Sequence, residues 1–234
     1  MLNRRSFCGC ALFSGLTATT TAHAQSSECA VFTPARQKAV SPDEAIERLK
    51  AGNERFVSGK TVNCNLMQQV KETAHSQAPF AAVVGCIDSR VPPELVFDQR
   101  IGDIFCGRVA GNFVNTDLIG SLEYATKVVG ARAIVVLGHS ECGAVKSAVD
   151  DVKLGNITAM LANIRPAVAA TKSTGDRTSK NHAFVQAVAE TNAKLAAQKL
   201  TQDSPVLREL VEAKQLRIAT AMHDIATGKV TFLA

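Results

Sequence analysis

Residues 83–90 read VVGCIDSR, a stretch in which an apolar run stops at a glycine and gives way to a thiol, a carboxylate and a guanidinium. The same order returns at residues 133–143, AIVVLGHSECG, where the apolar run ends before a histidine and a cysteine. Continuous apolar runs of this length are typical of strands buried on both faces in a parallel sheet covered by helices. The sequence therefore predicts an α/β fold with a central, mostly parallel sheet flanked by helices.

Cys86, His139 and Cys142 follow the two predicted strands. Ligands of open α/β sheets bind outside the carboxyl ends of the strands, so we expect these side chains to share one edge of the sheet. Two thiolates and an imidazole suit Zn²⁺, and three protein ligands leave a fourth tetrahedral position open, as in catalytic zinc sites. The sequence therefore predicts one Zn²⁺ per subunit. A disulfide between Cys86 and Cys142 is the alternative, and the accompanying His139, Asp88 and Arg90 count against it.

Asp88 and Arg90 lie beside the predicted metal ligands and are candidate catalytic residues. Because two thiolates cancel the charge of Zn²⁺, the metal is a weaker Lewis acid than one held by three neutral imidazoles. Nearby groups must then help to acidify its water. The Asp88 carboxylate can accept a hydrogen bond or a proton from that water. The Arg90 guanidinium, always charged and fork-shaped, can hold the carboxylate by paired hydrogen bonds.

The chain resembles the β-class carbonic anhydrase family in five sequence blocks that follow one another between residues 51 and 148. These are GNERF (52–56), QAP (77–79), CIDSRVP (86–92), RVAGN (108–112) and HSECGA (139–144). The resemblance implies Zn²⁺ on Cys86, His139 and Cys142, with Asp88 and Arg90 beside it. The implied reaction is the reversible hydration of CO₂ to bicarbonate and a proton, by attack of zinc-bound hydroxide.

Further roles rest on the resemblance alone. Gln77 occupies the place of a family glutamine that reaches into the neighbouring subunit's active site and donates a hydrogen bond to substrate. This implies a homodimer, and homotetramers are also common in the family. Gly143, which opens a helix, is expected to lend a backbone N–H. Val91, Val109 and Phe113 are candidates for the apolar wall on which CO₂ rests.

Asp88 has two alternative positions, because in some family members this aspartate rotates onto the zinc and silences the enzyme. The family's inhibitory bicarbonate pocket uses a tryptophan, an arginine and a tyrosine. Here Arg108 and Tyr124 match two of these, but Val83 takes the tryptophan's place and the chain has no Trp. We therefore expect an open site with Asp88 off the metal.

The first 24 residues have the features of an export signal. Arg4 and Arg5 precede an apolar segment, residues 22–24 form a small-x-small cleavage site, and residues 3–7 resemble a twin-arginine signal. An ordinary secretory signal is the alternative, and either route places the mature chain outside the cytoplasm, with the periplasm as the expected compartment. Beyond this segment, no apolar run of about 20 residues predicts a membrane span.

The rest of the 234-residue chain is expected to comprise an extended arm at residues 25–40 and a single α/β domain at residues 41–234. Its 46% hydrophobic and 20% charged residues are typical of a globular protein. Loss of the signal's two arginines lowers the formal net charge from +5 to +3. Such a modest balance argues against nucleic acid as a partner.

Five cysteines remain after removal of the signal. Cys29 and Cys64 lie outside the blocks that carry the resemblance. In an oxidising compartment they are free to form a disulfide, and two separate thiols are the alternative. Cys106 lies within an apolar run and is expected to be a small buried hydrophobic residue rather than a reactive thiol.

Several further elements follow from local patterns. Ser41, Pro42 and Glu44 predict the start of a helix that has Ser41 as its N-cap. Periodicity predicts other helices at residues 66–76, 116–129, 143–150, 157–170 and 182–200. A strand is expected at residues 104–109, and a terminal hairpin at residues 216–222 and 229–233, with its first strand joining the sheet.

Two other functions remain open. Relatives with the same metal site hydrolyse carbonyl sulfide or carbon disulfide, and the shape of the access channel would decide between those substrates and CO₂. A non-catalytic, zinc-stabilised binding protein is the third reading. Its mark would be the loss of Asp88 or Arg90, and both are present.

Overall fold

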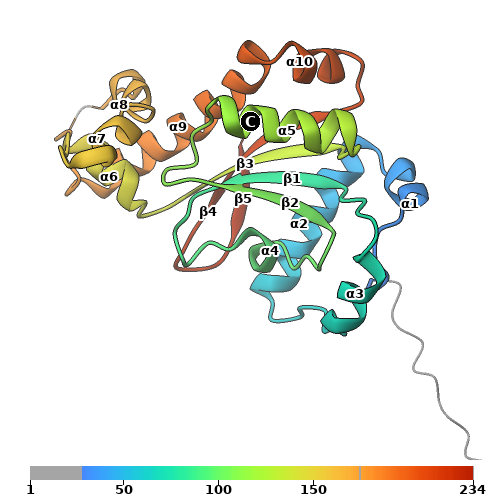
Figure 1. Cartoon of the computed structure of the whole chain (residues 1–234). Coiled ribbons are helices and arrows are strands. Elements are labelled where there is room, and N and C mark those ends of the chain that lie inside the picture. Colours follow the sequence, from blue (N-terminus) through green and yellow to red (C-terminus); the bar gives the residue numbers. More distant parts are fainter. Residues whose placement is uncertain (1–27, 174, 234) are drawn as a thin grey trace, which may run out of the picture.

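A five-stranded sheet forms the centre of the computed structural model, which describes residues 28–173 and 175–233 (Figure 1). The strands are β1 (Ala81–Gly85), β2 (Ile104–Arg108), β3 (Ala133–His139), β4 (Arg217–His223) and β5 (Val230–Leu233). Their order is β2-β1-β3-β4-β5; the first four are parallel, and β5 runs antiparallel to β4. The predicted mostly parallel sheet with a terminal hairpin is therefore confirmed.

The central strands are buried on both faces because their side chains alternate between two hydrophobic clusters. Val84 and Val136 belong to one cluster, and Val83 and Val135 belong to the other. The register pairs Val83 with Val135 and Val84 with Val136, so equivalent residues of β1 and β3 share a face. Both faces need apolar side chains, which is why the two strand sequences are continuously apolar instead of alternating with polar residues.

Helices cover both faces of the sheet (Figure 1). One layer contains α5 (Thr116–Glu123), α9 (His182–Asp203) and α10 (Pro205–Glu212), and the other contains α2 (Pro42–Val57) and α4 (Pro93–Val96). The remaining helical elements are α1 (Pro34–Ala39), α3 (Leu66–Thr73), the π-helical turn η1 (Tyr124–Val128), α6 (Gly143–Val149), α7 (Gly155–Leu161) and α8 (Arg165–Ala170). Helices α6, α7 and α8 gather beyond one end of the sheet, where α6 and α8 contact α9.

The start of α2 is as predicted, but the arm before it is not. The backbone N–H of Glu44 donates to Ser41 Oγ at 3.1 Å, and Pro42 is the first residue of the helix. The expectation of an extended arm over residues 25–40 is wrong for Pro34–Ala39, which form α1. Thr33 caps this helix, and Pro34 fixes φ in its first turn. Both features are signals of a helix start. Residues 25–27 and the predicted export signal lie outside the described residues.

The helix expected at residues 157–170 is broken into α7 and α8. Asn163 Nδ2 donates to the carbonyl oxygens of Ala159 and Met160 and so satisfies acceptors at the end of α7. Pro166 stands in the first turn of α8, where its missing N–H ends the preceding hydrogen-bond ladder. The short helices α4 and α10 also lie outside the helices predicted from periodicity.

A disulfide joins Cys29 to Cys64 across 35 residues of sequence. It ties the N-terminal segment to the loop before α3, and Gln69 Nε2 in α3 also donates to the Cys29 carbonyl at 2.9 Å. The remaining described cysteines, Cys86, Cys106 and Cys142, are free. Cys106 is half-buried, and burial raises the pKa of its thiol, so it is an unreactive residue as expected.

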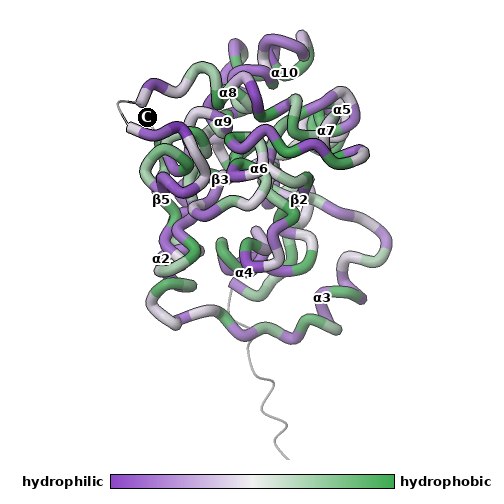
Figure 2. Tube along the Cα trace, turned by 90° about the vertical axis from the view of Figure 1, so that its left-hand side faces the viewer, coloured by the Kyte–Doolittle hydropathy of each residue, from purple (hydrophilic) through white to green (hydrophobic). Residues whose placement is uncertain are grey.

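Hydrophobic and hydrophilic residues alternate along the helices on the outside of the molecule (Figure 2). None of the helices within residues 28–173 and 175–233 combines the length and the apolar character needed to cross a lipid bilayer. Many of their apolar residues belong to the two clusters described above.

Candidate metal centre and active site

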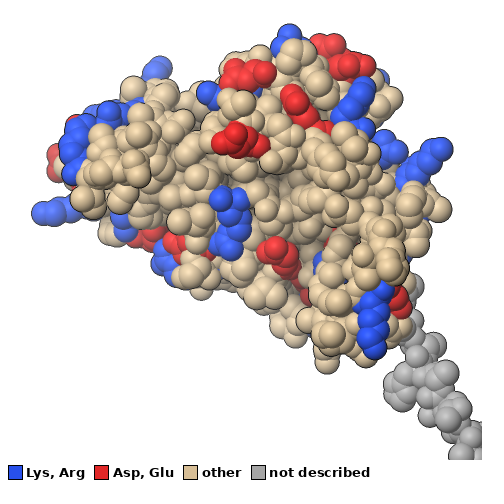
Figure 3. Space-filling model, viewed as in Figure 1, with Lys and Arg blue, Asp and Glu red and all other residues tan. Residues whose placement is uncertain are grey.

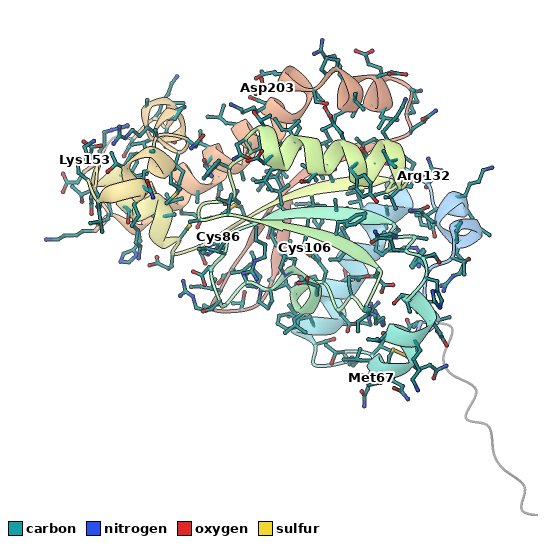
Figure 4. All side chains as sticks on the ribbon, viewed as in Figure 1. Met67, Cys86, Cys106, Arg132, Lys153 and Asp203 are labelled. Atoms are coloured by element: carbon teal, nitrogen blue, oxygen red, sulfur yellow. A yellow bond between two sulfur atoms is a disulfide. The ribbon has the colours of Figure 1, made fainter. Side chains whose placement is uncertain are left out.

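Three potential metal ligands converge at the carboxyl-terminal edge of the sheet. Cys86 follows β1, His139 ends β3 and Cys142 precedes α6. Their ligand atoms lie within 4.8 Å of one another, and all three residues are buried. Figure 4 shows Cys86 at one end of the sheet and Arg132 at the opposite end. Because β1 and β3 are neighbouring parallel strands, the loops that follow them meet, as the sequence predicts.

His139 is oriented as a metal-binding histidine. Its Nδ1 lies 2.9 Å from the carbonyl oxygen of Ser140, so Nδ1 carries the proton and Nε2 presents its lone pair. Nε2 is buried and has no hydrogen-bond partner among the described residues. Burying such an atom is unfavourable unless a ligand occupies it, and a hydrogen bond from the other ring nitrogen is the usual support of zinc-bound histidine. These residues therefore fit Zn²⁺.

The sulfur atoms of the two cysteines interact directly. The pKa of Cys86 is lowered, first by the hydrogen bond from Cys142 and also by the backbone N–H of Gly111, 3.2 Å from Sγ. The pKa of Cys142 is raised by Cys86 beside it and by burial, although the N–H groups of Ala144 and Val145 oppose this. Two sulfurs this close cannot both ionise by themselves. A divalent cation between them would let both become thiolates.

Asp88 is held by Arg90 through two side-chain hydrogen bonds. Arg90 Nε donates to Oδ1 at 2.9 Å and Nη2 donates to Oδ2 at 2.7 Å. These bonds keep the pKa of the Asp88 carboxyl well below its usual range. Arg108 donates to the carbonyl oxygens of Cys86 at 2.8 Å and Asp88 at 2.7 Å, which fixes the loop. Asp88 Oδ2 lies 3.9 Å from His139 Nε2, so an ionised acceptor stands beside the candidate metal position.

Gln77 lies far from the metal ligands of its own chain. It is exposed and stands in the loop before the amino end of β1, whereas Cys86 follows the carboxyl end. A five-residue strand spans roughly 16 Å at its usual rise per residue. The Gln77 side chain cannot bridge that distance, so its predicted role requires a second copy of the chain.

The other predicted site residues are placed separately. Gly143 is the exposed first residue of α6, and a Cβ built on it would meet no atom within 4 Å. Val91 is fully buried in the cluster that contains residues of α2 and α4. Phe113 belongs to the cluster on the opposite face, and Val109 packs against that cluster. The candidate residues of the apolar wall are thus divided between the two clusters, and their contact with CO₂ stays a prediction.

The three equivalents of the family's bicarbonate pocket lie on three different elements, β1, β2 and η1. Val83 is fully buried within β1, and Arg108 is committed to the loop carbonyls described above. Tyr124 is 51% exposed on η1 and lines a cavity between β2 and α5. The expectation of an open site with Asp88 off the metal stays a prediction.

His223 lies beside the site and was not predicted from the sequence. It ends β4, pairs in register with His139, and accepts a hydrogen bond at its carbonyl from Ser140 N at 2.9 Å. The imidazole is buried, and neither ring nitrogen has a partner among the described residues. Burial lowers the pKa of His223, so the ring is neutral near pH 7. A lone histidine at the end of an apolar strand carries no sequence signal for this position.

Glu141 lies between His139 and Cys142 in the sequence, and it was not predicted to contribute to the site either. Its backbone is left-handed, with φ of 55°. The carboxylate is ion-paired with Lys146 and with His182 Nδ1, the latter at 2.7 Å. The hydrogen bonds from Lys146, first, and from His182 lower the pKa of Glu141. His182, an exposed residue at the start of α9, thus contacts the metal loop through Glu141.

Comparison with known proteins agrees with this site. A carbonic anhydrase family model matches residues 81–230, which is more than half of the chain and contains all three candidate ligands. Carbonic anhydrase 2 of Mycobacterium tuberculosis (strain ATCC 25618 / H37Rv) is 42% identical over 118 residues, or 50% of this chain and 57% of that protein. The chain therefore matches little more than half the length of that relative. A carbonic anhydrase of Mycolicibacterium smegmatis is 35% identical over 197 residues, or 81% of this chain and 92% of that protein.

Solved structures share the fold. The β-carbonic anhydrase CafA of Aspergillus fumigatus superimposes with a TM-score of 0.64 at 24% identity, covering 82% of this chain and 89% of that one. A tetrameric β-carbonic anhydrase of Sordaria macrospora gives a TM-score of 0.62 at 24% identity, covering 72% and 90%. Together, the family match, the relative aligned over most of its length and the shared fold show that this chain belongs to the β-class carbonic anhydrase family.

Proposed function

We propose that this protein catalyses the reversible hydration of CO₂ to bicarbonate and a proton, with one Zn²⁺ held by Cys86, His139 and Cys142. The observation that carries the proposal is the convergence of these three buried ligands within 4.8 Å, beside an aspartate held by Arg90. Family membership supports the same reaction. Zinc bound here would supply the Lewis acidity that makes a water molecule nucleophilic near neutral pH.

Asp88 positions a water molecule in this proposal. Because its pKa is held low by Arg90, the carboxylate is ionised and can only accept a hydrogen bond. An acceptor beside the metal orients a water molecule and fixes the direction of its lone pairs. Arg90 donates a hydrogen bond to each carboxylate oxygen of Asp88, and these two bonds hold Asp88 off the candidate metal position. A transient rotation onto the metal would have to break both bonds.

Self-association completes the proposed site. Gln77 can donate to substrate only across a subunit boundary. Exposed apolar residues lie on α3, which precedes Gln77 (Leu66, Met67 and Val70), and Ile101 lines a cavity together with Gln77. Strand β2 is an edge of the sheet, and a cavity of about 790 Å³ lies beside it and α5. Uncharged atoms cover most of this face (Figure 3). An unpaired edge strand and exposed apolar residues support a homodimer as the functional unit, with a homotetramer as a further assembly.

Export to the periplasm, by a twin-arginine or ordinary secretory route, is part of the same proposal. The disulfide between Cys29 and Cys64 supports it, because such bonds persist in oxidising compartments and are rare in the cytosol. Separation of the periplasmic and cytosolic fractions of the native host, followed by detection of the protein in each, tests this step directly. Recovery of the full-length protein in the cytosol alone would contradict it.

Stopped-flow CO₂ hydration and zinc analysis of the mature protein test the proposed reaction. Cys86→Ser is expected to lose both zinc and activity, because a hydroxyl does not replace a thiolate ligand. Asp88→Ala is expected to keep zinc and to slow turnover. Cys106→Ser is the matched control and is expected to keep both properties, because Cys106 lies outside the ligand set. A wild-type protein that binds zinc without hydrating CO₂ would contradict the proposal.

A further inference from the structure

Asn192 is a buried polar residue in the middle of α9. It is 3% exposed, and Val188, Ala189 and Ala196, one turn away along the helix, are buried in the hydrophobic cluster on that face of the sheet. Residues three or four positions apart share one face of a helix, so Asn192 points into this apolar layer. A buried amide is unfavourable without a hydrogen-bond partner, and Asn192 therefore requires one within the protein.

The partner of Asn192 is the backbone carbonyl of Gly111. Asn192 Nδ2 donates to this oxygen at 2.7 Å, through a buried hydrogen bond between residues that are 81 positions apart in the sequence. Gly111 lies in the loop that follows β2, whose last residue is Arg108. The bond therefore joins the centre of α9 to the loop that contacts Cys86.

Gly111 presents its backbone N–H to the metal ligand Cys86. Asn112 N donates to Val109 O at 3.0 Å, which closes a four-residue turn with Gly111 at its third position. The φ of Gly111 is +83°, the left-handed value that a type II turn requires there. In this conformation the Gly111 N–H donates to Cys86 Sγ at 3.2 Å. The carbonyl that Asn192 holds and the N–H that Cys86 receives thus belong to one residue.

Neighbouring side chains restrain Gly111 at its Cα. A Cβ built on it would lie 2.4 Å from Ile164 Cδ1 and 3.3 Å from Ala144 Cβ, so these two side chains limit movement in that direction. A glycine has no side chain of its own that could fix its φ and ψ angles by packing. The bond from Asn192 supplies that restraint, because it holds the carbonyl and limits rotation of the backbone on the carboxyl side of Gly111.

A hydrogen bond to a sulfur ligand changes how that sulfur binds a metal. Groups that bond to metal ligands orient them and tune the metal, and their loss typically weakens metal binding about 10- to 100-fold. Cys142 receives such bonds from the N–H groups of Ala144 and Val145 at the start of α6. Cys86 follows a strand instead, and the turn at Gly111 provides an N–H for it.

We propose that Asn192 is a positioning residue of the metal centre. Its amide holds the Gly111 carbonyl and thereby keeps the Gly111 N–H on Cys86 Sγ. The inference rests on the proposed binding of Zn²⁺ by Cys86, His139 and Cys142, and it adds α9 to the elements that support this site. Asn192 acts through Gly111 and takes no part in the chemical step.

Competition with a chelator measures the zinc dissociation constant of the mature protein and of its variants. Asn192→Asp has nearly the same shape, but an ionised carboxylate only accepts hydrogen bonds and cannot donate to the Gly111 carbonyl. Asn192→Ala removes the donor without adding a charge. Both variants are expected to bind zinc at least about tenfold more weakly than the wild type.

Leu200→Ala is the matched control, because Leu200 is fully buried on the same helix. It destabilises the fold by leaving a cavity, without removing a hydrogen bond from the loop at Gly111. Its zinc dissociation constant is expected to equal that of the wild type. All measurements are made under conditions in which urea denaturation curves show each variant to be folded.

Cobalt(II) substitution separates a positioning role from general destabilisation. The thiolate-to-cobalt charge-transfer band reports the energy of the sulfur lone pairs, which an N–H donor lowers. Loss of the Gly111 bond should therefore move this band to longer wavelength in Asn192→Asp and Asn192→Ala. Leu200→Ala should leave the band at its wild-type position.

Three results would overturn the inference. These are a zinc affinity of the Asn192 variants equal to that of the wild type, equal weakening by Leu200→Ala, and a charge-transfer band that does not move. Each of them leaves the proposed CO₂ hydration intact, because the wild type still binds zinc. A wild-type protein without zinc affinity would contradict the proposed metal centre itself, so the two failures are distinguishable.

Discussion

Arg90 donates to both carboxylate oxygens of Asp88, through Nε at 2.9 Å and Nη2 at 2.7 Å, and thereby holds the carboxylate beside the candidate metal position without placing it there. Arg90 is 52% exposed, whereas Asp88 is 15% exposed. The arginine therefore acts from the solvent side on a more buried partner.

Replacing Arg90 by glutamine is expected to free Asp88 while leaving the three metal ligands unchanged. Without the fork, the pKa of Asp88 should rise towards its ordinary value, because Arg90 is the main cause of its lowering. We expect a fall in kcat/KM of at least about tenfold, within the range typical of a positioned proton acceptor, with zinc content unchanged. Stopped-flow assays and metal analysis measure both quantities. Arg208→Gln, an exposed arginine on α10, is the control, and equal activity of the two variants would contradict the role given to Arg90.

The free energy of unfolding should depend on pH through the ionisation of Asp103. Burial raises the pKa of this carboxyl to about 6 from the ordinary value of 3.8. The group is therefore easier to protonate in the folded chain, so its stabilising contribution is complete below pH 4 and is lost as the pH rises through about 6. A shift of this size corresponds to about 3 kcal/mol.

Urea denaturation from pH 4 to pH 7 tests this expectation. The free energy of unfolding of the wild type should fall relative to that of Asp103→Asn across this interval, by up to about 3 kcal/mol. Other titrating groups are common to both proteins and cancel in the difference. Parallel stability curves would show that Asp103 has an ordinary pKa in the folded protein.

Gly111 should not tolerate a side chain. Its φ is +83°, and an added Cβ would lie 2.4 Å from Ile164 Cδ1, so both the backbone and the packing oppose alanine. We expect Gly111→Ala to destabilise the fold by about 2–4 kcal/mol, from strain and overpacking together. Its N–H also donates to Cys86 Sγ, so zinc affinity should fall as well.

Gly120 provides the matched control for that substitution. It is exposed within α5, and an added Cβ would meet no atom within 4 Å. Because alanine favours helix more than glycine does, Gly120→Ala should stabilise the fold by about 0.5–1 kcal/mol. Denaturation curves of the two variants should therefore move in opposite directions, and a shared direction would contradict the assigned backbone conformations.

Breaking the disulfide should lower stability without affecting the metal ligands. Cys29→Ser and Cys64→Ser are each expected to cost about 2–4 kcal/mol, because the bond constrains a 35-residue loop in the unfolded chain. The double variant should resemble either single one, since both remove the same bond. Thermal unfolding measures the effect, with Cys106→Ser as the control. Additive losses in the double variant would show that the cysteines act separately.

The centre of the sheet could be predicted from sequence because β1 and β3 are short strands that are buried on both faces. Residues 83–90 and 133–143 show where β1 and β3 end, and strands that end side by side necessarily bring Cys86, His139 and Cys142 together. Helix limits were harder to predict. α1 has only six residues, and the break between α7 and α8 depends on local turns at Asn163 and Pro166 that periodicity does not detect.

The parts of the site that depend on distant contacts could not be predicted. His223 reaches His139 only because β4 pairs with β3, and Asn192 reaches Gly111 only because α9 packs against the loop after β2. The bond between Cys29 and Cys64 stayed one of two alternatives in the sequence, since spacing alone does not fix a pairing. Gln77 depends on a second chain, which the sequence of one chain cannot place.

X-ray absorption at the zinc K-edge of the purified mature protein tests the central claim most directly. We predict one zinc per chain with two sulfur neighbours at about 2.3 Å and two lighter neighbours, one imidazole nitrogen and one oxygen, at about 2.0–2.1 Å. A protein without zinc, or a zinc shell of four sulfurs, would contradict the assignment of Cys86, His139 and Cys142 as the ligands of an open metal centre.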